Sequence, residues 1–122
     1  MKKVLIIDDE EDLVNMTAIS LKRWGYEPLK AFSGKEGIEM LAKNPPDLAI
    51  IDIRMPDLSG YDICKKIKLK NKLSKIPVII STAAGTLDIK KLLASTGAKD
   101  IIIKPYDNED LKKKIENLLG KR

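Results

Sequence analysis

The sequence predicts a doubly wound α/β fold, in which helices cover both faces of a parallel five-stranded sheet. Strand-like runs and helical segments alternate five times along the chain, which is the pattern of such folds. Three of the runs, VLIID, LAIID and VIIST, are apolar until they end in polar residues, as strands buried on both faces are. The chain of 122 residues, 43% of them hydrophobic, fits one domain over residues 1–122.

The predicted strands are the short runs at each return of this alternation. In chain order they are Val4–Asp8, Glu27–Ala31, Leu48–Asp52, Val78–Thr82 and Asp100–Lys104. The segments between and after them are predicted to be helices, because their apolar residues recur three and four positions apart. In chain order these helices are Glu11–Trp24, Lys35–Lys43, Tyr61–Lys68, Leu87–Ser95 and Asp107–Leu119.

Capping residues mark the ends of two predicted helices, and apolar residues mark the face that each helix is expected to bury. Gly97 stops the fourth helix. Asp107 is a natural N-cap for the fifth, and Asp110 is placed like the second half of a capping box. The apolar stripes of the five helices are, in order, Leu13, Met16, Ile19 or Ser20, and Leu21; Ile38, Leu41 and Ala42; Ile63, Cys64 and Ile67; Leu87, Ile89 or Lys90, Leu92 and Leu93; Leu111, Ile115, Leu118 and Leu119.

Right-handed crossovers between successive strands make such a sheet parallel and place helices on both of its faces. For five units of this kind we expect the flavodoxin-like strand order 2-1-3-4-5, with five helices. The order reverses between the first and third strands. Ligands of open parallel sheets bind at such a reversal, beyond the carboxyl ends of the strands.

The composition excludes several kinds of chemistry. The chain has no histidine, so it has no His-based metal site, no histidine general base and no Ser-His-Asp triad. Its one cysteine, Cys64, forms no internal disulfide and suits a reducing compartment. No apolar run has the length of a membrane span or of a signal-peptide core. We therefore expect a cytoplasmic protein that does not insert into membranes.

Charge is distributed unevenly over a net +5. Residues 1–60 carry 8 basic and 11 acidic side chains, whereas residues 61–122 carry 15 and 7. A basic half suits an acidic partner surface or nucleic acid. Because its lysines are spread out and few aromatic residues accompany them, we interpret them mainly as solvated helix faces and expect no direct contact with nucleic acid.

Carboxylates gather at the predicted order reversal. Asp8 and Asp9 follow the first strand, with Glu10 just beyond, and Asp52 ends the third. Alone, Asp8 and Asp9 could simply favour the dipole of the next helix. Together with Asp52 they crowd like charges, which a hard divalent cation compensates. Since only oxygen ligands are available, Mg²⁺ is the favoured ion.

Two further polar residues end strands at the same edge. Thr82 ends the fourth strand and Lys104 the fifth. An ammonium and a hydroxyl beside a metal and carboxylates make a site for a phosphoryl group. Asp52 could then act as a nucleophile and form an aspartyl phosphate.

These residues stand within recognisable motifs. They are the Asp8–Asp9 pair, IDIRMPDLSG around Asp52, STAAG after the fourth strand and IIIKPY after the fifth. In order and spacing they resemble the response-regulator receiver domain, the phosphoacceptor module of two-component signalling. The resemblance covers essentially the whole chain.

The resemblance implies a role for each matched residue. Asp52 is the expected phosphoacceptor. Asp8 and Asp9 are the expected acidic pair that organises Mg²⁺, with Asp9 and Asp52 as direct ligands. The backbone carbonyl of Arg54 would supply another ligand.

The resemblance also implies a switch. Thr82 is the expected switch hydroxyl, with the Ala83 amide near the phosphoryl oxygens. Lys104 is the expected conserved-type lysine, and Lys104–Pro105 the expected cis peptide. The family's usual aromatic partner, three residues before the lysine, is Ile101 here, so a ring movement cannot carry the signal.

The implied function is a phosphorylation switch that catalyses only its own phosphorylation and dephosphorylation. A sensor histidine kinase or phosphotransfer protein would supply the phosphoryl group. A downstream protein would bind the face formed by the fourth helix, fifth strand and fifth helix, and the chain would be a monomer or weak dimer. It would act alone or as the receiver of a longer regulator.

Two other functions use related sheets. A Mg²⁺-dependent phosphatase of this kind requires a general acid two residues after its nucleophilic Asp, and this chain has Arg54 at that position. A flavin-binding electron carrier wants a Ser/Thr/Gly-rich phosphate loop after the first strand, where this chain has Asp8 and Asp9. Both departures favour the switch.

Overall fold

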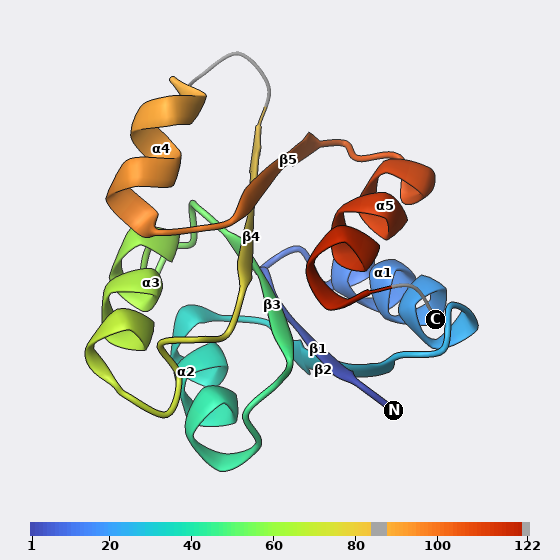
Figure 1. The fold of residues 1–122 in the computed structure, drawn as a ribbon, viewed down its shortest axis with the longest axis horizontal. Coiled ribbons are helices and arrows are strands. Elements are labelled where there is room, and N and C mark those ends of the chain that lie inside the picture. Colours follow the sequence, from blue (N-terminus) through green and yellow to red (C-terminus); the bar gives the residue numbers. More distant parts are fainter. Residues whose placement is uncertain (84–87, 121–122) are drawn as a thin grey trace.

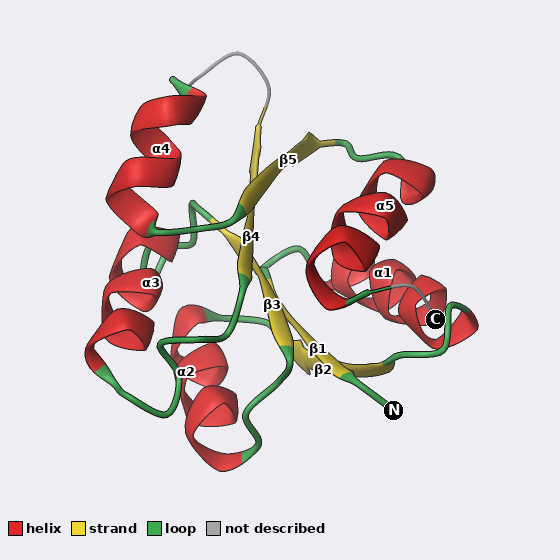
Figure 2. Ribbon diagram, viewed as in Figure 1, coloured by secondary structure: helices red, strands yellow, loops and turns green. Residues whose placement is uncertain are grey.

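The computed structural model describes residues 1–83 and 88–120, and within them five strands alternate with five helices (Figures 1 and 2). The strands are β1 (Lys3–Ile7), β2 (Glu27–Ala31), β3 (Leu48–Asp52), β4 (Val78–Ala83) and β5 (Asp100–Lys104). The helices are α1 (Glu11–Arg23), α2 (Gly34–Lys43), α3 (Gly60–Leu69), α4 (Ile89–Thr96) and α5 (Asn108–Leu119). The predicted elements are all present, although the predicted start of the fourth helix, Leu87, lies outside the described residues. The predicted stripe of the first helix was wrong in part: Met16 is exposed, and α1 instead buries Val14, Ala18 and Leu21 because these residues face the sheet.

The sheet has the predicted topology. Its strand order is β2-β1-β3-β4-β5, and every neighbouring pair is parallel. Figure 1 shows α1 and α5 on one face of the sheet and α2, α3 and α4 on the other. The doubly wound α/β fold is therefore confirmed, and all carboxyl ends of the strands lie at one edge.

Two apolar cores lie on the two faces of the sheet, because successive strand residues point to opposite faces. Leu5 and Ile7 of β1 belong to the core under α2, α3 and α4. Val4 and Ile6 belong to the core under α1 and α5. All five residues of β3 are buried, so the central strand supports the site from within the core.

Side-chain caps fix the helices that flank the site. Ser59 and Asp62 form a reciprocal capping box at the start of α3, which stabilises a helix N-terminus by about 1 kcal/mol. Asp107 caps α5 as predicted, but its side chain accepts from the amide of Glu109, so the predicted reciprocal capping box with Asp110 does not form among the described residues. Gly97 ends α4 in the left-handed region, with φ of 72°, where a residue without Cβ is favoured.

No helix in the described ranges is long and apolar enough to cross a bilayer.

Candidate functional site

The register of the sheet brings the predicted residues to one edge. Asp8 directly follows β1, and Ile7 at the end of that strand pairs with Ile51, next to Asp52. On the other side of β3, β4 and β5 end together, with Ala83 opposite Lys104. Residues from both ends of the chain thus meet around the end of β3.

Three carboxylates form a compact cluster. One oxygen from each of Asp8, Asp9 and Asp52 lies within 4.8 Å of the other two. Asp8 and Asp52 are buried and Asp9 is exposed. The donor set is oxygen only, with one side open to solvent, which suits a hard cation that keeps some of its water.

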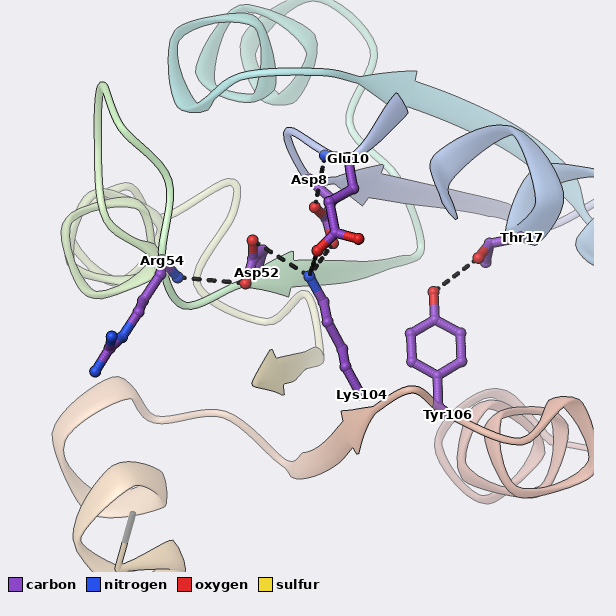
Figure 3. A network of polar contacts seen from close by, with 7 residues as sticks. All are labelled: Asp8, Glu10, Thr17, Asp52, Arg54, Lys104 and Tyr106. Carbon is purple, nitrogen blue, oxygen red and sulfur yellow. Dashed lines mark hydrogen bonds and ion pairs between the residues drawn. The ribbon is translucent and has the colours of Figure 1, made fainter. Parts of the chain in front are cut away.

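Lys104 is the cation that compensates these charges in the structure. Its Nζ lies 2.7 Å from Asp8 Oδ2, 3.1 Å from Glu10 Oε1 and 3.4 Å from Asp52 Oδ2, and Figure 3 shows it reaching between the three carboxylates. Burial opposes its charge, but the hydrogen bond to Asp8 and the charges of Asp8 and Asp52 raise the pKa of Lys104 above its ordinary value. The lysine therefore stays protonated.

Asp52 sits in an environment that favours its neutral form. Burial, and next the charge of Asp8, raise its pKa from 3.8 to about 6, against the opposing effects of Lys104 and the Arg54 amide. Desolvation of a carboxylate and a nearby like charge both act in this direction. A perturbed carboxylate in a cleft is a candidate nucleophile or metal ligand.

Arg54 meets the site through its backbone. Its amide donates to Asp52 Oδ1 at 3.3 Å, while its exposed guanidinium is directed away from the carboxylate (Figure 3). The side chain therefore does not cover Asp52 in this structure.

A cavity of about 290 Å³ opens over the carboxylates. Its walls include Asp9, Glu10, Asp52, Arg54, Ala83 and Lys104. Thr82 is buried one residue before Ala83 and is not among the described residues that line this cavity. Ala83 thus lines the cavity, whereas Thr82 is buried and does not line it.

Two contacts were not anticipated from the sequence. Glu10 adds a third carboxylate to Lys104, although its position beside Asp8 and Asp9 could have suggested this. The hydroxyls of Thr17 and Tyr106 lie 2.7 Å apart (Figure 3). This bond ties α1 to the segment after β5, and burial raises the pKa of the Tyr106 phenol.

The sequence model of one protein family, the response regulator receiver domain, matches residues 4–116. The chain belongs to this family. The receiver domain is also 30% identical over 119 residues to the DNA-binding dual master transcriptional regulator RpaA of Synechocystis, covering 98% of this chain and 49% of that protein. It spans about half the length of the curated relatives it matches.

Solved structures resemble the receiver domain over its whole length. The chemotaxis protein CheY4 of Vibrio cholerae is 27% identical with a TM-score of 0.90, over 97% of this chain and 98% of that one. The N-terminal domain of a response regulator receiver protein from Methanoculleus marisnigri is 34% identical with a TM-score of 0.77, over 100% and 99%. Fold and family are as the sequence predicted.

Other family features fall as follows in this receiver domain. The Lys104–Pro105 peptide is cis, as expected. Ile101, at the place of the usual aromatic partner, is buried in the core under α2, α3 and α4 and pairs with Ile80 of the neighbouring strand. Ala84, two residues after Thr82, lies outside the described residues.

Proposed function

We propose that this receiver domain accepts a phosphoryl group on Asp52 from a sensor histidine kinase or phosphotransfer protein, with Mg²⁺ bound beside it. One observation carries the proposal. Asp9, Asp52 and Lys104, from three strand ends, line one cavity, and Asp8 contacts Lys104 beside it. Such a set of carboxylates and an ammonium suits phosphoryl chemistry.

The residues present fit Mg²⁺. The cluster offers carboxylate oxygens within 4.8 Å of one another, and its three carboxylates outnumber the one ammonium, that of Lys104, which contacts Asp8 and Asp52. Asp9 and Asp52 would be direct ligands, Asp8 would support them, and the backbone carbonyl of Arg54 would complete the protein's share. When bound, the ion supplies positive charge against the oxygens of the transferring group.

The chain's own residues perform the transfer. A carboxylate oxygen of Asp52 attacks the phosphorus of the donor phosphohistidine in line. The new P–O bond forms as the P–N bond breaks, and the departing imidazole keeps the electron pair and takes a proton from solvent. Lys104, already 3.4 Å from Asp52, turns its ammonium to a phosphoryl oxygen.

Thr82 and Ala83 supply the switch in this proposal. The Ala83 amide donates to the phosphoryl group at the cavity wall. Because Thr82 is buried and does not line the cavity, its hydroxyl would move toward the phosphoryl oxygen. That movement favours a second arrangement of the segment after β4, and a two-state element of this kind is what a local charge change can bias.

The output surface proposed is the face of α4, β5 and α5. A second cavity of about 480 Å³ lies there, lined among others by Ile89, Ile103 and Tyr106. Ile89 and Ile103 are large apolar side chains exposed to solvent, and exposed apolar residues that line a cavity favour a protein partner. We place the protein in the cytoplasm, as a monomer or weak dimer.

The test uses intact-mass spectrometry after incubation with Mg²⁺ and acetyl phosphate. Wild type should gain one labile phosphoryl adduct, and Asp52→Asn should gain none while keeping its fold by circular dichroism. A normal adduct on Asp52→Asn would contradict the assignment. Repeated turnover of phosphate esters by wild type would favour the phosphatase instead.

A further inference from the structure

A third cavity, lined by three lysines, lies at the opposite edge of the sheet from Asp52. It measures about 360 Å³, within the roughly 300–1,000 Å³ of small-molecule sites. Val78, the first residue of β4, lines it, whereas Ala83 at the other end of that strand lines the carboxylate cavity. The lysine-lined cavity and the carboxylate cavity have no lining residue in common.

Three separate segments contribute lysines to the lining of this cavity. Lys68 comes from α3, Lys75 from the segment before β4, and Lys99 from the turn between α4 and β5. In the described part of the chain, ion pairs join only Lys104 and Lys114 to carboxylates. The three lysines at the cavity thus have no counterion there.

No acidic residue is among the described residues that line the cavity. Between Asp62 and Asp88 the sequence has six lysines and no Asp or Glu. The carboxylate next in sequence to Lys99, that of Asp100, is already paired with Lys114 at 3.2 Å. Burial raises the pKa of the Cys64 thiol, which also lines the cavity, to about 11, so the thiol adds no charge.

The floor of the cavity is apolar and held in place. Ile67 and Val78 line it and are buried. Lys68 lies across Gly97, where a Cβ would collide with the lysine side chain, so the absence of a side chain at Gly97 lets the lysine reach over the wall. Positive groups around an apolar floor suit an anion that carries an organic body.

We infer that this cavity, formed between α3, the start of β4 and the α4–β5 turn, binds a small organic phosphate with at least two negative charges. Three ammonium groups can share the oxygens of a phosphate, for which lysine acts as a point charge. The carbon skeleton would lie on Ile67 and Val78. The aromatic side chains that would stack on the bases of a nucleic acid are absent from the described walls of the cavity.

The probes are pyrophosphate and ADP, added to ¹⁵N-labelled protein in EDTA so that no Mg²⁺ bridges them to the acidic cluster. Saturable amide shifts are expected at Gly97, Ala98 and Lys99, and none at Asp9. The variant Lys68→Gln/Lys75→Gln/Lys99→Gln should weaken binding by at least about tenfold, or 1.4 kcal/mol.

A matched variant separates a site from general charge. Lys65→Gln/Lys72→Gln/Lys90→Gln removes the same charge from exposed lysines that do not line the cavity, and it should bind within about twofold of wild type, as scattered surface charges contribute little. Equal weakening in both variants, or no saturable shift below about 10 mM, overturns the proposal.

Two further arms identify the source of the phosphate. Binding of free ADP shows a soluble ligand. Binding only to vesicles that contain phosphatidic acid, again lost in the cavity variant alone, assigns the phosphate to a lipid headgroup. The proposal is overturned if ADP binding does not saturate while the protein binds duplex DNA and both variants weaken that DNA binding equally. Phosphorylation by acetyl phosphate is measured on the same variants, so a failure of Asp52 chemistry is seen separately.

Discussion

The surroundings of Asp52 favour the neutral form of its carboxyl group. Its folded-state pKa of about 6 lies above the ordinary 3.8, so the folded protein binds this proton more tightly than the unfolded chain does. Stability from this group is therefore greatest at low pH and is lost as the pH rises from about 4 to 6.

Asp52→Asn should consequently stabilise the metal-free protein at pH 8 by about 1–3 kcal/mol, since each pKa unit corresponds to about 1.4 kcal/mol. The gain should shrink at pH 4. Urea denaturation in EDTA at both values measures it, with Asp12→Asn on the exposed face of α1 as the control. A loss of stability at pH 8 would mean that the pairing of Asp52 with Lys104 outweighs its desolvation.

Asp9 is the exposed member of the cluster, close to two buried carboxylates. Asp9→Asn removes one like charge, so the melting temperature without metal should rise. The same change removes a proposed ligand, so the further rise on adding Mg²⁺ should be smaller than in wild type. Thermal melts with EDTA and with Mg²⁺ measure both effects. A lower metal-free melting temperature would indicate a structural hydrogen bond from Asp9.

The residues at Arg54 and Ala84 bear on how long a phosphoryl group would persist. Hydrolysis needs an attacking water held in line. Arg54 is only a donor and cannot accept a proton, and Ala84 has no polar side chain. We therefore expect slow self-dephosphorylation, measured as the decay of the adduct in wild type, Arg54→Asn and Ala84→Gln. Because the Arg54 guanidinium is directed away from Asp52, equal rates in all three would assign water placement to the backbone.

At the scale of elements, the start of α3 presses directly on the strand that carries Asp52. A Cβ at Gly60 would lie 2.7 Å from the Asp52 carbonyl oxygen and 2.8 Å from Ile53 Cα, and backbone atoms cannot move aside cheaply. Gly60→Ala should therefore cost about 1–3 kcal/mol and slow phosphorylation by acetyl phosphate, because the end of β3 shifts.

Ser59→Ala is the matched control for this element. It removes the capping box of α3 and should cost about 1 kcal/mol without changing the phosphorylation rate. Denaturation midpoints and adduct formation are measured on both variants. If Gly60→Ala phosphorylates at the wild-type rate, the close contact at the helix start does not set the position of Asp52.

At the scale of the whole molecule, one sheet is shared by two cores. Trp24, the only tryptophan, packs against the core under α1 and α5. The other core holds α2, α3 and α4. Because β1 and β3 contribute to both, we expect one cooperative transition. Tryptophan fluorescence and far-ultraviolet circular dichroism should give the same midpoint in urea. An earlier fluorescence midpoint would mean that the two faces unfold separately.

The sequence alone determined the fold and most of the strand-end residues at the site. The continuous apolar runs around Ile6, Ile50 and Ile80 are typical of strands buried on both faces, and right-handed crossovers favour a doubly wound parallel sheet for five such units. Asp8, Asp9, Asp52 and Lys104 were predictable as neighbours because parallel strands end at one edge, so their place in the chain settles their place in space.

Only the tertiary structure decided how these side chains pair. The closer approach of Lys104 to Asp8 and Glu10 than to Asp52, the outward direction of Arg54, and the burial of Thr82 away from the cavity lining are known only from the structure. So is the meeting of Lys68, Lys75 and Lys99, which lie in three segments. Hydrophobic periodicity in the sequence indicates which face of a helix or strand is buried. The energy of an ion pair depends instead on the distance between the two charged atoms, and the periodicity does not encode that distance.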